Sequence, residues 1–193
     1  MMNLLSLKIT EIFLSEKIIS DEDIDIYVYG FEMVISNIIT VIITILTGVL
    51  FGNLFDAFIF YTVFSSTRRF SGGYHASTYI GCKITYIICI VSVMLLANTF
   101  LFLSQFLQFH FLILLICLFN IITVSILSPI EHKNKPLTKK DKRINKIRSI
   151  FVSMSWLAIA FAPIWWGSNI IHVILLTQFS ISILIFKCAF AKV

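Results

Sequence analysis

The stretch that decides the fold is ITYIICIVSVMLLANTFLFLSQFLQFHFLILLICLFNIITVSILSPI, residues 84–130, between Lys83 and Glu131. Its 47 residues include no Lys, Arg, Asp or Glu. A helix needs about 20 apolar residues to cross the hydrocarbon core of a bilayer. The run is therefore long enough for two membrane spans, with a connection expected at residues 104–110, where polar residues interrupt it.

Three further charge-free runs predict the remaining spans. Residues 33–55 accommodate one span, and residues 149–186 accommodate two shorter spans separated by a turn. Residues 57–67 are short for a span, but a tight turn at Gly52-Asn53 would let the second span cover residues 54–66. The count is six transmembrane helices, with four as the alternative if the short second span is a re-entrant segment.

The composition agrees with an all-α integral membrane protein. The chain is 59% hydrophobic and only 13% charged, with a mean hydropathy of +0.97, whereas soluble domains are about a quarter charged. A soluble core of this size cannot hide so much apolar surface. The four cysteines are too widely spaced for a disulfide framework or a zinc motif. We therefore expect residues 1–193 to form one polytopic membrane domain.

The first thirty residues, 1–30, predict an interfacial N-terminal segment. Within residues 3–19, apolar residues recur near helical spacing and the charged residues fall between them, which is typical of an amphipathic helix on a membrane surface. A mobile, partly helical terminus is the alternative. Ser20-Asp21-Glu22-Asp23 then reads as the N-cap and acidic first turn of the next helix.

Lys and Arg in the connections predict the orientation. The basic loop, residues 130–148, holds eight Lys or Arg against two acids, a net charge of 8 − 2 = +6. The connections near residues 53, 105 and 168 have neither Lys nor Arg. With six spans, all basic segments and both termini therefore fall on the cytoplasmic side. Thr138-Lys139-Lys140-Asp141 resembles a capping box, so a basic helix is expected to begin there and lead into the fifth span.

One polar island, residues 68–82 (RRFSGGYHASTYIGC), separates the second and third apolar runs. Cys82 lies where the third run begins, and a helix starting near Thr78 would put it in the first turns, where the dipole and nearby Lys83, Arg68 and Arg69 favour a thiolate. His75 lies seven residues before Cys82, in the same polar island. The two residues are candidates for a nucleophile and its base.

The spacing of the pair restricts its geometry. Seven residues on one helix separate two Cα atoms by about 10 Å, so a single unbroken helix cannot bring His75 to Cys82. A bend is required, and Gly72-Gly73 permits it. The sequence alone leaves other interpretations open: an interfacial His, a packed Cys, arginines that only anchor the chain, and a basic loop that only binds anionic lipid.

The segment Arg68-Arg69-Phe70-Ser71-Gly72-Gly73-Tyr74-His75-Ala76, followed by Cys82, resembles the signature of the AgrB (accessory gene regulator protein B) family. SPIEHKNKPL, residues 128–137, also resembles a loop of that family. Its members are membrane cysteine endopeptidases of Gram-positive bacteria. The length and span pattern extend the resemblance over nearly the whole chain.

The resemblance implies a function in quorum sensing. Such proteins cut the C-terminal part from a propeptide, AgrD, keep the new C-terminus as a thioester, and promote its cyclisation to a thiolactone or lactone. Carried over by position, Cys82 would be the nucleophile and His75 the acid–base group. Arg68, Arg69, Gly72 and Gly73 would hold the peptide or the oxyanion, and Glu131 is a candidate to orient His75.

The resemblance also implies a homodimer in the plasma membrane, and the distribution of Lys and Arg predicts that the active site faces the cytoplasm. We expect no cofactor, metal or nucleic-acid partner. A peptide transporter or exporter without proteolysis is the alternative function, with polar residues such as Asn37, Asn98, Asn120 and Gln178 lining a path. A membrane scaffold is a third possibility.

Overall fold

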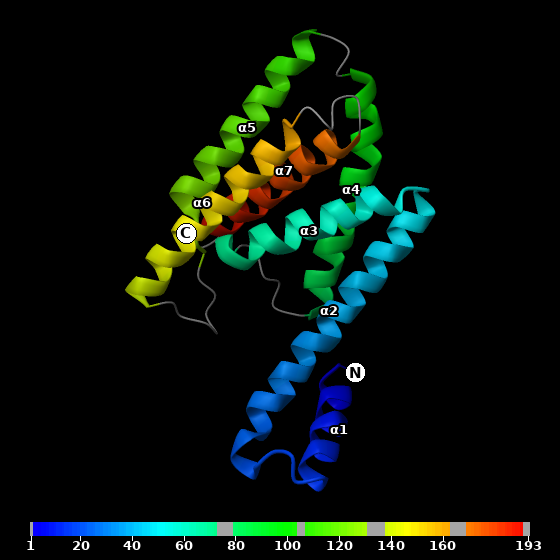
Figure 1. Cartoon of the computed structure of the whole chain (residues 1–193), viewed down its shortest axis with the longest axis vertical. Coiled ribbons are helices and arrows are strands. Elements are labelled where there is room, and N and C mark those ends of the chain that lie inside the picture. The colour runs from blue at the N-terminus through cyan, green and yellow to red at the C-terminus, as the bar shows by residue number, and fades with distance from the viewer. Residues whose placement is uncertain (1, 73–78, 104–106, 131–137, 163–168, 191–193) are drawn as a thin grey trace. The chain divides into compact units, whose positions relative to one another are not determined.

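The computed structural model describes residues 2–72, 79–103, 107–130, 138–162 and 169–190. These residues form helices and no strands, so the predicted all-α class is confirmed. In chain order, the elements are α1 (Met2–Ser15), a 3₁₀ turn (Asp21–Asp23), α2 (Ile24–Leu50), α3 (Leu54–Ser71), α4 (Tyr79–Leu103), α5 (Leu107–Leu127), α6 (Lys139–Ala160) and α7 (Asn169–Phe190) (Figure 1).

Helices α2 to α7 each overlap one of the six predicted spans. Among the described residues, three stretches are long and apolar enough to cross a bilayer by themselves: Asp21–Leu50, Ile80–Leu103 and Asn169–Phe190. The apolar part of α5, Phe111–Leu127, is shorter. The chain is therefore a membrane protein, while the count of six spans and the side on which the termini lie stay predictions.

Local sequence signals explain where two of the helices begin. Gly52 has a φ of +68°, and Asn53 caps α3 by accepting a hydrogen bond from the Asp56 N–H at 3.1 Å. Thr138 caps α6 in the same way through the Asp141 N–H, also at 3.1 Å. The predicted turn at Gly52-Asn53 and the predicted basic helix that continues into the fifth apolar run are both confirmed.

The start of α2 differs from the prediction. Ser20 precedes the 3₁₀ turn, but its hydroxyl donates to the Asp23 carboxylate at 2.7 Å and makes no cap with a backbone N–H. The acidic first turn is present, and α2 proper begins only at Ile24. Because the first turn is 3₁₀, the Asp23 N–H donates to the Ser20 backbone carbonyl at 3.1 Å and not to the Ser20 hydroxyl.

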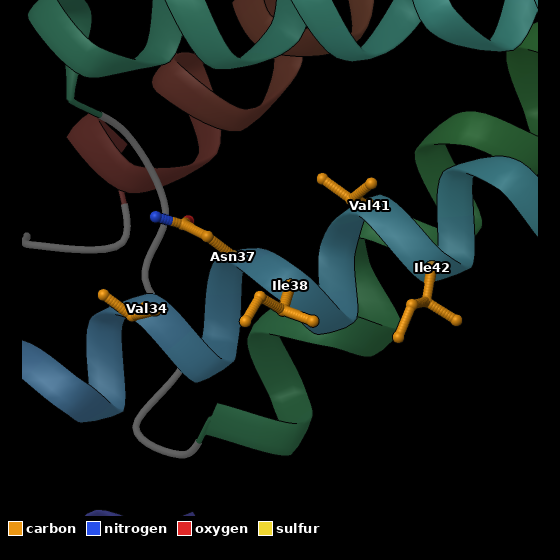
Figure 2. A pocket seen from close by; sticks show the side chains of 5 residues that line it. All are labelled: Val34, Asn37, Ile38, Val41 and Ile42. Atoms are coloured by element: carbon orange, nitrogen blue, oxygen red, sulfur yellow. The ribbon is translucent and has the colours of Figure 1, made fainter.

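Residues 1–43 form one compact unit, built from α1 and the first part of α2. The predicted N-terminal helix is confirmed as α1. The Phe13 and Phe31 rings meet edge to face at 5.2 Å. Figure 2 shows an apolar groove on α2, in which Asn37 is the one polar side chain among those that line it: Val34, Asn37, Ile38, Val41 and Ile42.

Residues 44–193 form the second compact unit, and α7 is its central helix. Helix α7 packs against α3, α4, α5 and α6 (Figure 1). Its residues from His172 to Gln178 are all buried. One apolar cluster joins Val63, Ala160, Ile170 and Ile174, and another joins Cys117, Leu157 and Leu175. The sequence pattern indicated a membrane helix here but not its central position.

A hydrogen-bonded polar network crosses this apolar core. The Asn120 side-chain amide of α5 donates to the Gln178 side-chain carbonyl at 3.2 Å and to the Ser182 hydroxyl at 2.8 Å, both on α7. The Ser153 hydroxyl of α6 donates to the Asn120 carbonyl at 2.6 Å, and the Gln178 amide donates to Thr67 of α3 at 3.2 Å. Each of the five residues is at most 2% exposed. The network thus links four helices.

This network changes the interpretation of the polar residues in the spans. The transporter alternative placed Asn120 and Gln178 along a path, but both side chains are fully buried and hydrogen-bonded between helices. The third residue of that set, Asn98, is hydrogen-bonded to Asn169. Polar side chains commonly join membrane helices in this manner. Three of the four residues therefore have a structural explanation.

We predict that Ser153→Ala destabilises the protein by about 1–2 kcal/mol, because the buried Asn120 carbonyl loses a short hydrogen bond. Ser155→Ala on the same helix is the matched control, since the Ser155 hydroxyl donates only to the Phe151 carbonyl one turn earlier. Thermal unfolding in detergent micelles measures both. Equal midpoints for the two variants would contradict the assigned importance of the network.

Candidate active site

The structure describes four of the seven predicted site residues. Arg68 and Arg69 lie in the last turn of α3, Gly72 caps that helix, and Cys82 is the fourth residue of α4. His75, Gly73 and Glu131 lie outside the described residues. The predicted pairing of His75 with Cys82 therefore stays a prediction, and the geometry below concerns the surroundings of Cys82.

Cys82 lies where the sequence placed it, at the beginning of a long apolar helix. Helix α4 starts at Tyr79, and Cys82 is half-buried in its first turn. The first turn of a helix carries backbone N–H groups without intrahelical partners, and the positive end of the helix dipole. This is the environment in which reactive cysteines occur.

Arg68 of α3 supplies a positive charge to this thiol. It lies just beyond the predicted second span, and burial lowers the pKa of its guanidinium, whereas electrostatic interactions with Cys82, Cys89 and Cys188 raise it. Lys83 interacts electrostatically with Cys82 as well. The Arg68 guanidinium also lies 5.4 Å from the centre of the Phe64 ring. The charge of Arg68 therefore interacts with cysteines of both α4 and α7.

Cys188 is a neighbour that sequence reasoning did not single out. It lies near the end of α7 and, like Cys82 and Cys89, interacts electrostatically with Arg68. It is 106 positions after Cys82, and no motif connects the two. Only the packing of α7 against α3 and α4 brings these thiols to one arginine. The sequence holds no signal that would have found this.

Arg69 has a different environment from Arg68, although the sequence treats the two as a pair. Its side chain is exposed, and its guanidinium lies 5.9 Å from the centre of the Phe70 ring. Arg148 of α6 lies 5.8 Å from the centre of the same ring. The two arginines therefore differ: Arg68 interacts electrostatically with Cys82, whereas Arg69 shares the Phe70 ring with Arg148 of α6.

Gly72 is required by a close contact with the connection between α5 and α6. Its φ is +68° and its ψ is −147°, a combination that is essentially confined to glycine. Its N–H donates to the Arg68 carbonyl at 3.1 Å, and a Cβ atom would lie 2.4 Å from the Ile130 carbonyl oxygen. The Ile130 N–H donates to the Ser71 carbonyl at 3.0 Å. The two segments that resemble family motifs, 68–82 and 128–137, thus meet here.

A second polar cluster lies where α3 and α7 begin. Asp56 is 4% exposed, accepts from the Asn53 side-chain amide at 2.7 Å and is hydrogen-bonded to Asn169. His172 is also buried, and among the described residues its Nδ1 atom has no hydrogen-bond partner. In the described part of the chain, no three His, Cys, Asp or Glu side chains are close enough to hold a metal.

We predict that Gly72→Ala lowers the free energy of unfolding more than Gly52→Ala does. The difference between the two variants is expected to be at least about 1 kcal/mol. Both glycines have a φ of +68°, but a Cβ atom at Gly52 would meet nothing within 4 Å. The excess cost therefore reports the contact with Ile130. Thermal unfolding of the two variants measures it, and equal losses would mean that the connection after α5 does not rest on Gly72.

A comparison with protein families places these features in context. A search of curated proteins and a search of solved structures gave no match. The family model described as Accessory gene regulator B matches residues 6–188, which include every described residue of the site. The family supports a role in processing a quorum-sensing peptide and implies a peptide substrate and membrane association. The chain belongs to the AgrB, accessory gene regulator B, family.

Proposed function

We propose that this chain is a membrane-embedded cysteine endopeptidase that cleaves an AgrD-like propeptide. The observation that carries the proposal is the position of Cys82, in the first turn of α4 with Arg68 and Lys83 as charged neighbours. A thiolate nucleophile requires such an electropositive, partly accessible site. The resemblance of residues 68–82 to the family signature and the match to the family model give further support.

In the proposed mechanism, His75 takes the proton from the Cys82 thiol, and the thiolate attacks the carbonyl carbon of the scissile peptide bond. His75 then returns the proton to the leaving amine as the C–N bond breaks. The N-terminal part of the peptide stays on Cys82 as a thioester. A Cys or Ser side chain within that peptide next attacks the thioester carbonyl, which releases a cyclic thiolactone or lactone and restores the Cys82 thiol.

The remaining site residues stabilise charge in this scheme. Arg68 offsets the negative charge of the thiolate and of the oxyanion that forms during attack, because its charge interacts with Cys82. The Gly73 backbone amide is a further candidate to bind the oxyanion or the peptide, whereas the Gly72 N–H, which we expected to do the same, already donates to the Arg68 carbonyl. Glu131 would orient His75. Arg69, exposed beside Arg148, would instead contact acidic side chains of the peptide.

We further propose that the site faces the cytoplasm of a Gram-positive bacterium, at the edge of the plasma membrane. The basic residues of α6 begin at Lys139 and are exposed, which suits an acidic peptide tail or anionic lipid headgroups. A site at the membrane edge keeps water from the thioester until cyclisation. We also propose that the protein forms a homodimer, and this part of the proposal rests on its family alone.

We predict that Cys82→Ser and His75→Ala each lower propeptide cleavage by at least about 10²-fold. The assay uses reconstituted vesicles and candidate amphipathic propeptides, with mass spectrometry to detect the released tail and an acyl adduct of Cys82. Cys117→Ser is the control, because Cys117 packs with Leu157 and Leu175 in the core. Cleavage that survives Cys82→Ser would exclude the proposed nucleophile.

We also predict that the two arginines differ in their kinetic effect. Arg68→Gln lowers kcat by about tenfold or more, since a cation that interacts with Cys82 is lost. Arg69→Gln raises KM and weakens its dependence on salt, because an exposed charge acts mainly on encounter and binding. The same vesicle assay at two ionic strengths measures both. Identical effects of the two substitutions would contradict the assigned division of roles.

A further inference from the structure

Three serines from separate parts of the chain meet beside the end of α3. Ser71 is the last residue of α3, Ser128 follows α5, and Ser149 lies in α6. Ser71 and Ser149 are fully buried and Ser128 is 4% exposed. The Ser128 hydroxyl lies 3.2 Å from the Ser71 carbonyl oxygen and 3.0 Å from the Ser149 hydroxyl. We call Ser71, Ser128 and Ser149 the serine joint.

The Ser128 hydroxyl is the central hydrogen-bond donor of the serine joint. The Ser149 hydroxyl donates its only proton to the Lys146 carbonyl at 2.9 Å, so toward Ser128 its oxygen acts as an acceptor. Ser128 has one proton, which lies within reach of both Ser149 and the Ser71 carbonyl. The Ser71 carbonyl accepts a second bond, from the Ile130 N–H. One hydroxyl thus ties α6 to the end of α3.

The end of α3 is the point from which the proposed site is built. Arg68, which interacts with Cys82, lies three residues before Ser71, and its carbonyl accepts the Gly72 N–H. The chain that leads to His75 leaves α3 immediately after Gly72. A shift of this end would therefore displace Arg68 relative to Cys82. Displacements of about 1 Å are enough to lower catalytic rates strongly.

We propose that Ser128, with Ser149 as its hydrogen-bond acceptor, is a positioning residue of the active site. The serine joint fixes the last turn of α3 against α6, and so holds Arg68 in place toward Cys82. Ser128 acts through α3 and is not itself a catalytic residue. This inference rests on the proposed cysteine-protease function, and it adds residues that lie outside the sequence motif around His75 and Cys82.

The geometry makes the role of Ser128 separable from folding. In Ser128→Ala, the Ser71 carbonyl keeps the bond from the Ile130 N–H, and the Ser149 hydroxyl keeps its bond to Lys146. No buried polar group of the serine joint is then left without a partner. The variant is expected to fold, with an end of α3 that is less firmly held. Ser149→Ala removes the acceptor of the same bond and provides a second, independent variant.

The experiment uses the full-length chain in vesicles and measures two rates. One is propeptide cleavage, resolved into kcat and KM. The other is alkylation of Cys82 by iodoacetamide, followed by mass spectrometry, which requires no substrate peptide. We expect Ser128→Ala and Ser149→Ala each to lower kcat and the alkylation rate by about tenfold, with KM within about twofold. The double variant should match the single variants, because both remove one bond.

Ser153→Ala is the control, one turn further along α6 and in the core network. It should lower the unfolding midpoint and leave kcat and Cys82 alkylation unchanged. Unchanged rates in Ser128→Ala and Ser149→Ala, or equal losses of both rates in Ser153→Ala, would overturn the positioning role. If the wild type shows no Cys82-dependent cleavage but alkylation still falls in Ser128→Ala, the protease proposal fails and the positioning of Cys82's surroundings stands.

Discussion

The hydrogen bonds around Asn120 and Gln178 are the interaction on which the arrangement of α3, α5, α6 and α7 depends. Helices in lipid gain little by hiding apolar side chains from one another, because the lipid tails are equally apolar. A buried amide, in contrast, must find a partner. Asn120, Ser153 and Gln178 satisfy one another only when their helices adopt this one register. The network therefore selects a single packing among many apolar alternatives.

Helices α3 and α6 also contribute residues near the candidate site. Helix α3 contributes Thr67 to the core network and, one residue later, Arg68 toward Cys82. Helix α6 contributes Ser153 to the network and, four residues earlier, Ser149 to the serine joint. The core network and the site are thus adjacent on two helices. The network holds α3, which carries Arg68, whereas Cys82 lies on α4, which contributes no residue to the network.

The Gly72–Ile130 contact joins two segments that are far apart in the sequence and that both resemble family motifs. A side chain at position 72 would collide with the Ile130 backbone, and the backbone of Gly72 adopts angles that other residues avoid. The connection after α5 can therefore lie directly against the end of α3. Basic residues of α6 and the exposed Arg69 then share one side of this joint, around Phe70. In the proposed function, these exposed basic side chains would contact the peptide substrate.

The sequence by itself determined the helical class, the positions of the helices, and the caps at Asn53 and Thr138, because these depend on apolar run length and on residues close in the chain. It also located Cys82 at a helix start. Only the tertiary structure decided that α7 is central, that Arg68 and Arg69 separate, and that Cys188 and Ser128 join the surroundings of the site. These depend on contacts between residues far apart in sequence, and apolar periodicity in lipid does not specify which helices meet.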